Sequence, residues 1–157
     1  AWLKQWGHDV HLHLVGAATP GVAEQLTRQA REAGMENFEI TGFTTDDQYR
    51  DCILGVDLGI QLRVSPFLGV SGPLADMAAY GTPGMGSNGL AIDVDTPDFI
   101  DRLPDEVSPL MVAEAIEYRL SRPVSAEDRE QMRREYLAAK SPRRYAELML
   151  ALLREAS

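Results

Sequence analysis

Residues 71–74 (SGPL) have the types and spacing best suited to binding chemistry. They follow a predicted buried strand over residues 58–62 and open a predicted helix. A helix that begins where a strand ends directs unpaired backbone N–H groups and its positive dipole end into the crevice above the sheet. Ser71 is suited to capping, Gly72 lets a ligand approach the backbone, and Pro73 suits the first helical turn. The stretch therefore predicts a site for an anion, most often a phosphate.

Arg63 lies directly after the same predicted strand, beside the predicted anion site. Its guanidinium could hold a diphosphate through paired hydrogen bonds. An ion pair with a nearby acid, serving only the fold, explains an arginine here equally well. The residue types leave these two interpretations equally open.

Strands alternate with helices along the first half of the chain. We expect strands over residues 11–15, 38–42, 58–62 and 84–87. The helix after the first strand opens at Thr19 and Pro20, and the helix after the second is capped by Asp46 or Asp47. Because each parallel pairing needs a crossover, this alternation predicts an α/β fold: one doubly wound, Rossmann-like parallel sheet with helices on both faces. Ligands in such sheets bind at the carboxyl ends of the strands.

The second half of the chain is predicted to be mainly helical. A short strand is expected over residues 90–94, within a stretch rich in Asp and Pro. Helices are expected to start at Ser108, Ser125 and Ser141, each a suitable capping residue. The chain has no repeats, so we expect these helices to pack on the same core.

Composition indicates one soluble globular domain over residues 1–157. The apolar share is 45%, and no apolar run approaches the about 20 residues that a membrane span needs. A formal charge of -9 argues against nucleic acid as a partner, since most of the surface would repel it. The one cysteine, Cys52, suits a reducing compartment. We expect a cytoplasmic location, with peripheral membrane association as the alternative.

The histidines invite a test for a metal site. His11 and His13 share one face of the first predicted strand, and His8 is close in sequence. No cluster of Cys, Asp or Glu at ligand spacing completes a site around them. We therefore expect no metal and no cofactor.

Several segments together resemble a known family. The segments are HLHLVG, FEITGF, DLGIQLR, LADMAAYGTPGMGS and KSPRRYAELMLALL. In this order they resemble the C-terminal domain of retaining GT-B glycosyltransferases of the glycogen-synthase and mannosyltransferase-like group (family 4 type). The similarity covers nearly the whole chain. It implies an enzyme, a hexosyltransferase-like glycosyltransferase, of which this domain binds the nucleotide-diphosphate sugar that is transferred to a glycan, lipid or other acceptor.

The resemblance also implies roles for individual residues. Asp76 occupies the position at which the family's carboxylate holds the ribose hydroxyls. The helix start and its loop would bind the phosphates, and the end of the second strand would contact the base, largely through its backbone. The donor-binding residues implied are Arg63, Gly69, Ser71, Gly72, Leu74 and Asp76, with Gly42, Phe43 and Thr44 at the base.

The chain departs from the family pattern at the sugar-facing position. The family has a glutamate eight residues before its ribose-binding carboxylate, and this chain has Leu68 there, or Gly69 in an alternative alignment. No acidic side chain occurs between Leu58 and Ala75, so no catalytic residue is assigned. The alternative function is therefore a catalytically degenerate Rossmann-like domain that acts as a partner-binding or regulatory module.

The beginning of the chain generates a further expectation. Residues 1–6 (AWLKQW) have apolar residues at helical spacing with no start signal before them. The family's first strand unit and its N-terminal acceptor domain would both precede residue 1. We expect a fragment whose partners include that missing N-terminal domain, and whose unpaired sheet edges favour self-association.

Overall fold

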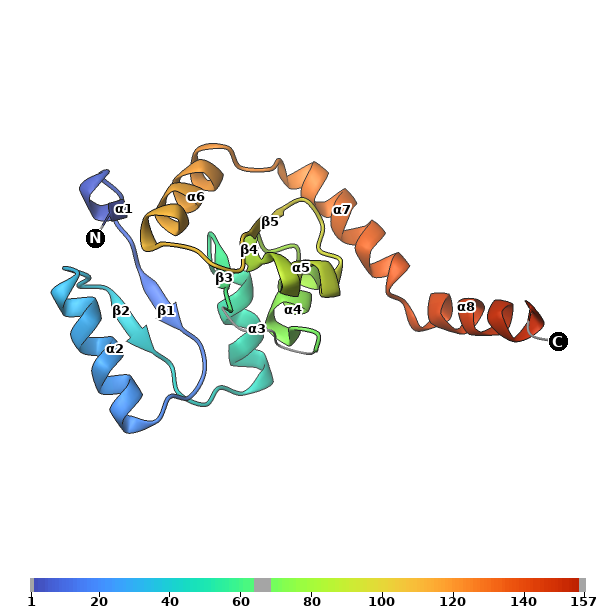
Figure 1. Ribbon diagram of the computed structural model, residues 1–157, viewed down its shortest axis with the longest axis horizontal. Helices are drawn as coiled ribbons and strands as arrows, with labels where there is room; N and C mark the ends of the chain where they lie inside the picture. The colour runs from blue at the N-terminus through green and yellow to red at the C-terminus, as the bar shows by residue number, and fades with distance from the viewer. Residues whose placement is uncertain (1, 64–68, 156–157) are drawn as a thin grey trace. The chain divides into compact units, whose positions relative to one another are not determined.

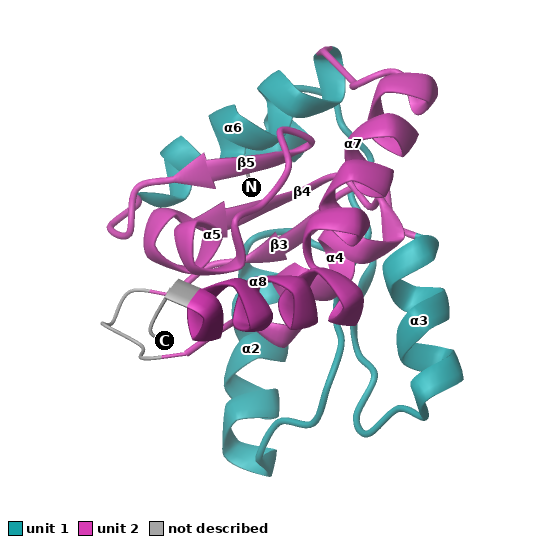
Figure 2. Ribbon diagram, turned by 90° about the vertical axis from the view of Figure 1, so that its right-hand side faces the viewer, with its two compact units in different colours: residues 1–55, 108–121 teal, residues 56–107, 122–157 magenta. Residues whose placement is uncertain are grey.

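The computed structural model describes residues 2–63 and 69–155 and contains helices and parallel strands in alternation (Figure 1). The elements run, in chain order, α1 (Trp2–Gln5), β1 (Leu12–Leu14), α2 (Pro20–Glu32), β2 (Phe38–Ile40), α3 (Asp46–Leu54), β3 (Gly59–Gln61), α4 (Gly72–Tyr80), β4 (Gly84–Ser87), α5 (Asn88–Val94), β5 (Ile100–Leu103), α6 (Pro109–Ser121), α7 (Ala126–Ala139) and α8 (Pro142–Glu155). The chain divides into two compact units, residues 1–55 with 108–121 and residues 56–107 with 122–157 (Figure 2). We call them unit 1 and unit 2.

Unit 1 contains a two-stranded parallel sheet of β1 and β2. The register places Leu12 opposite Phe38 and Leu14 opposite Ile40. Helix α2 makes the crossover between the strands, and it begins after Thr19 with Pro20 in its first turn, as predicted. Helix α6 joins this unit from later in the chain and packs against α1.

The cap of α3 differs from the prediction. Neither Asp46 nor Asp47 is the N-cap, because both lie inside the first turn of the helix. Thr45 is the cap: its hydroxyl accepts a hydrogen bond from Gln48 N, and Gln48 Oε1 accepts one from Thr45 N. This reciprocal pair is a capping box, which satisfies two backbone donors at once.

Unit 2 contains a three-stranded parallel sheet in the order β3-β4-β5. Helix α4 makes the crossover from β3 to β4, and α5 makes the crossover from β4 to β5. The core of this unit lies between the sheet and these helices. Its members with at most 4% exposure are Leu74, Met77, Ala78, Met85, Leu90, Ala91, Val94, Phe99 and Ile100.

Glycines let α4 approach the sheet of unit 2 closely. A Cβ atom added to Gly86 would lie 2.8 Å from Leu74 Cδ2, and one added to Gly59 would overlap Met77 Sδ. A Cβ added to Gly84 would lie 3.1 Å from the Gly59 carbonyl oxygen. The side chains of α4 therefore occupy the space that strand side chains would otherwise fill.

Two strand predictions are wrong. Residues 90–94 form part of helix α5, whose buried Leu90, Ala91 and Val94 follow helical spacing on the core side. The missed strand is β5, in the stretch rich in Asp and Pro that was expected to be a loop. Phe99 and Ile100, which are almost fully buried, bring this stretch into the core, and Gly84 N donates to Phe99 O.

The structure confirms the predicted parallel strands but does not pair them all in one sheet. Within the described residues the strands are parallel, as expected, but they form two small sheets. Strands β1, β2 and β3 are each three residues long. The alternating pattern of strands and helices requires parallel neighbours for each strand, but it does not determine which strands pair. The confirmed description is a mixed α/β fold with parallel strands.

The C-terminal helices differ sharply in their contacts. Helix α7 begins at Ser125, whose hydroxyl accepts from Asp128 N as predicted, and α7 packs against α4. In α8, by contrast, every side chain from Pro142 to Arg154 is exposed. Figure 1 shows α8 continuing beyond α7, away from the sheet of unit 2. The prediction that the last helix packs on the core is therefore wrong.

We expect Gly86→Ala to lower the free energy of unfolding by about 1–3 kcal/mol, because the new methyl group overpacks the buried Leu74 side chain. Gly72→Ala is the matched control: a Cβ there meets nothing within 4 Å, so its stability should not fall. Urea unfolding of both variants measures the difference. Equal stability of the two variants would contradict the close packing of α4 on β4.

Candidate functional site

The start of α4 is the candidate anion site. Ser71 occupies the N-cap position and Pro73 lies in the first turn, as predicted. The first intrahelical bond is donated by Ala75 N to Ser71 O, at 3.0 Å. The N–H groups of Gly72 and Leu74 precede it in the first turn, where the helix offers no carbonyl partner. Since the Leu74 side chain is fully buried, only its backbone is suited to contacting a ligand.

The Ser71 hydroxyl behaves differently from the prediction. Ser71 does not cap α4 through its side chain: no capping hydrogen bond is formed. Its Oγ atom is buried and has no hydrogen-bond partner among residues 2–63 and 69–155, and the residue is only 2% exposed. Leaving a buried hydroxyl unpaired costs about 1–3 kcal/mol. A polar ligand atom at this helix start would remove that cost.

Glycines flank the helix start on the loop side. Gly72 has open space where a side chain would be, with nothing within 4 Å of an added Cβ. Gly69 is exposed and has a φ of +142°, a conformation that favours glycine. Leu68, the position at which the resembling family has its glutamate, lies outside the described residues.

Arg63 is fixed by its backbone at the end of β3. Arg63 N donates to Ser87 Oγ at 2.6 Å, and the same hydroxyl donates to Arg63 O at 3.0 Å. Ser87 ends β4 and is 2% exposed. The serine therefore joins the carboxyl ends of two neighbouring strands, the edge at which parallel sheets bind ligands. The Arg63 side chain is half-buried.

Asp76 lies in the second turn of α4 and is half-buried. It is close enough to Tyr136 on α7 to contribute to the raised pKa of that phenol, although burial of the phenol is the larger cause. The carboxylate of Asp76 thus lies on the side of α4 that faces α7.

The three residues predicted to contact the base lie in unit 1, after β2. Gly42 has a φ of +72° and forms an isolated antiparallel bridge with Gly16. Phe43 is 94% exposed, so an aromatic face is available there for stacking. Thr44 is half-buried. The other predicted site residues belong to unit 2.

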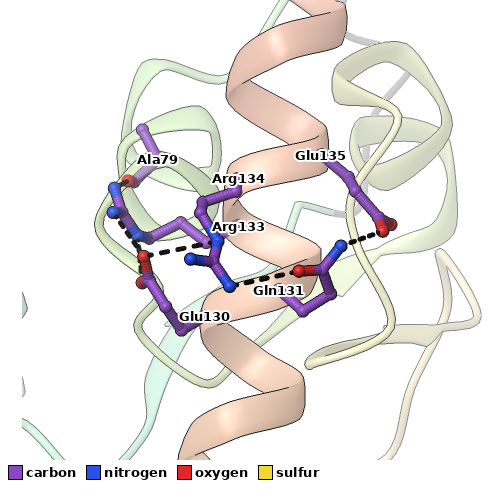
Figure 3. A network of polar contacts seen from close by, with 6 residues as sticks. All are labelled: Ala79, Glu130, Gln131, Arg133, Arg134 and Glu135. Carbon is purple, nitrogen blue, oxygen red and sulfur yellow. Dashed lines mark hydrogen bonds and ion pairs between the residues drawn. The ribbon is translucent and has the colours of Figure 1, made fainter.

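A polar network holds the other end of α4 (Figure 3). Arg133 on α7 donates from Nη1 to the carbonyl oxygen of Ala79, at 3.2 Å. Its Nε and Nη2 donate to the carboxylate of Glu130, and this bonding lowers the pKa of Glu130. A cation at a helix C-terminus interacts favourably with the helix dipole. Arg133 therefore helps to set the position of α4, and with it the helix start.

The histidines each lie beside a carboxylate. His8 pairs with Glu117, and His13 Nδ1 lies 3.4 Å from Glu39 Oε2. His11 Nε2 lies 3.1 Å from Asn37 Nδ2 and within 3.8 Å of Asp9. Within residues 2–63 and 69–155, no three His, Cys, Asp or Glu side chains form a group that could hold a metal ion.

Unit 1 contains a mainly apolar cavity of about 570 Å³, lined by α1, by α6, by the segment leading into β1 and by the segment between α2 and β2. Val112, Ala113 and Ile116 of α6 line one wall, and Lys4 and Glu36 contribute polar groups. Lys4 Nζ donates to Gly34 O at 2.8 Å, so this ammonium already has a partner. None of the predicted donor-binding residues lines this cavity.

Comparison with family models, curated proteins and solved structures finds no match to the chain. No helix in the described part of the chain is long and apolar enough to cross a bilayer. The role of the site is therefore inferred from the geometry of this structure alone.

Ser87 is the residue of this site that sequence reasoning missed as a participant. It was expected only as the last residue of a strand. Its position directly after Gly84-Met85-Gly86 gave a signal, since small residues there allow close approach of the neighbouring strand. The contact of its hydroxyl with Arg63 depends on the pairing of β3 with β4, which the sequence does not give.

We expect Ser87→Ala to reduce the free energy of unfolding by about 1–3 kcal/mol, because both backbone groups of Arg63 lose a partner. Ser121→Ala is the control, since that exposed hydroxyl donates only to Tyr118 O within its own helix. Chemical unfolding compares the two variants. A Ser87→Ala protein as stable as the control would show that the link between the strand ends is not needed.

Proposed function

We propose that this chain binds the nucleotide-diphosphate sugar donor of a glycosyltransferase, with the diphosphate at the start of α4. The observation that carries the proposal is the buried, unpartnered Ser71 hydroxyl at a helix start whose first glycine is open to a ligand. An anion there would accept hydrogen bonds from backbone N–H groups and from this hydroxyl. It would also lie at the positive end of the helix dipole.

Each predicted residue has a physical role in this proposal. The N–H groups of Gly72 and Leu74 bind phosphate oxygens, and Gly69 supplies the backbone conformation of the loop before them. Arg63, held at the strand ends by Ser87, supplies positive charge for the diphosphate. As the sugar–phosphate bond breaks, negative charge grows on the leaving diphosphate, and fixed donors stabilise it.

The remaining donor contacts involve the nucleoside. Asp76 accepts hydrogen bonds from the ribose hydroxyls, one turn further along α4. We propose no catalytic residue, no metal and no other cofactor. The acceptor, a glycan or lipid, and the N-terminal domain that binds it complete the proposed enzyme, which we place in the cytoplasm or at the membrane periphery.

The strand order supports a doubly wound fold of the proposed kind. A common doubly wound order is 3-2-1-4-5-6, in which strands 2 and 3 pair on one side of strand 1 and strands 4 to 6 pair on the other. The sheets β1-β2 and β3-β4-β5 have the order of these two groups without the central strand. We therefore keep the proposal of a doubly wound fold.

Asp76→Ala is the first functional test. It removes acceptors for two hydrogen bonds to the ribose, so affinity for the preferred nucleoside diphosphate should fall at least about tenfold. Calorimetry with a panel of nucleoside diphosphates measures this, and Asp93→Ala on α5 is the control. The Leu68→Glu variant should bind the bare diphosphate unchanged and the intact nucleotide sugar more tightly. Unaltered binding by Asp76→Ala would show the ribose assignment to be wrong.

Gly72→Ala tests the phosphate contact separately from the ribose contact. The methyl group meets open space in the protein, so the variant should fold normally, yet it would stand where the diphosphate approaches the backbone. We expect affinity to fall with no loss of stability. Gly21→Ala, near the start of α2, is the matched control, since its Cβ also meets nothing within 4 Å. Full affinity in Gly72→Ala would remove the diphosphate from this helix start.

A second candidate function, a partner-binding module, is favoured by α8. Its apolar side carries Tyr145, Leu148, Met149 and Leu152, and the last two are 61% and 62% exposed. The opposite side carries Arg143, whose guanidinium pairs with Glu147 at 3.1 Å. A helix with one apolar side normally buries that side. We propose that a second copy of the chain covers it, which agrees with the self-association expected from the sequence.

Replacing Leu148 and Leu152 together by Ser should shift the protein from dimer to monomer, because the apolar area that drives association is lost. Sedimentation equilibrium measures the change. Arg154→Ser, on the charged side of α8, is the control and should leave the dimer intact. If the unaltered chain is monomeric at every concentration studied, α8 does not mediate self-association.

A further inference from the structure

Unit 2 contains a hollow of its own, which is formed by the loop between α5 and β5 and by one side of α7. Its volume is about 320 Å³, which lies at the small end of the range of about 300–1,000 Å³ for ligand pockets. The residues on which the argument depends are Asp95, Thr96 and Asp98 from the loop and Met132, Glu135 and Tyr136 from α7. None of them belongs to the proposed donor site.

Thr96 contributes a polar group without a partner. Its backbone is well bonded: Thr96 N donates to Ala91 O at 3.1 Å, and Thr96 O accepts from Arg102 Nη2 at 3.0 Å. Its hydroxyl oxygen, however, is buried and has no hydrogen-bond partner in the described part of the chain, and the residue is only 4% exposed. A native core seldom keeps such a group unpaired. An occupant of the hollow that bonds this oxygen would satisfy it.

The charge of the hollow is negative. Asp95, Asp98 and Glu135 all line it. Lys140 Nζ lies 3.4 Å from Asp95 Oδ2, so one carboxylate already attracts an ammonium group. Burial first, and then the negative charge of Asp95, raises the pKa of the Tyr136 phenol, which shows that this carboxylate acts on the wall of the hollow. The ligand favoured by such walls is a cation.

The walls distinguish an organic cation from a metal ion. In the part of the chain that the structure describes, the carboxylates do not gather into a group of three that could hold a metal ion. Met132 and Tyr136 also line the hollow and can offer apolar surface beside the charged groups. An aliphatic stem can pack on that surface while its charged end remains with the carboxylates.

We propose that this hollow binds a small organic cation, an ammonium group on a short aliphatic stem. The ammonium lies with Asp95 and Glu135 and bonds to the Thr96 hydroxyl, and the stem packs on Met132 and Tyr136. Three donors of an ammonium suit this set of acceptors. The site is independent of the proposed donor binding, so either can fail without the other.

The first experiment titrates the full chain with n-butylammonium and follows the backbone amides by NMR. Saturable shifts are expected in residues 95–98 and 132–139. n-Butanol, which has the stem without the charge, and n-butyrate, which has the opposite charge, are the matched probes. Neither should cause these shifts at the same concentrations. Equal shifts with n-butanol, or none with n-butylammonium, would overturn the proposal.

Charge and hydroxyl variants complete the test. Asp95→Asn, which tolerates the left-handed φ of 57°, and Glu135→Gln should each weaken n-butylammonium binding by at least about fivefold, while Asp93→Asn on α5 should leave it unchanged. Thr96→Val should also weaken binding without lowering the unfolding temperature, because it removes an unpaired hydroxyl at nearly constant shape. Binding that is equal in all the variants and the unaltered chain would overturn the assignment.

Discussion

The close packing of α4 against β3 and β4 is the constraint on which the rest of unit 2 depends. Leu74 and Met77 fill the space left by Gly59 and Gly86, so the helix lies nearer to the sheet than side chains at those positions would allow. This approach fixes where α4 begins, and therefore where its free N–H groups lie. Arg133 acts on the same helix from its C-terminal end, through the Ala79 carbonyl. Helix α4 is therefore held by packing near its start and by a charged hydrogen bond at its C-terminal end.

The strand ends supply the second part of the frame. A single buried hydroxyl, that of Ser87, bonds both backbone groups of Arg63 and so takes the place of the next ladder pair between β3 and β4. The serine thus fixes the backbone of Arg63 at the carboxyl ends of two neighbouring parallel strands.

The start of α4 could be predicted from sequence because its signals are local. A serine, a glycine and a proline in succession specify a helix start whatever surrounds them. The strand over residues 90–94 was mispredicted because the same apolar residues fit a buried strand and a helix, and only burial of Leu90, Ala91 and Val94 on one side decides. The Thr45 cap had a local signal, Thr-x-x-Gln, which outweighs the aspartates beside it. The division into two sheets, the Ser87 contact and the unpartnered Ser71 hydroxyl depend on which strands pair, and no local pattern contains that information.

The ligands proposed at Ser71 and Thr96, two buried hydroxyls with no partner among the described residues, differ in charge. At Ser71 the helix N-terminus and its backbone donors favour an anion despite the formal charge of -9 on the whole chain. The hollow at Thr96 is lined by carboxylates, which favour a cation. Because an interior hydroxyl can both donate and accept, it suits either partner, and the charge around it decides which one binds. The phosphate proposed at the start of α4 would therefore depend on these local donors to offset the negative charge of the chain.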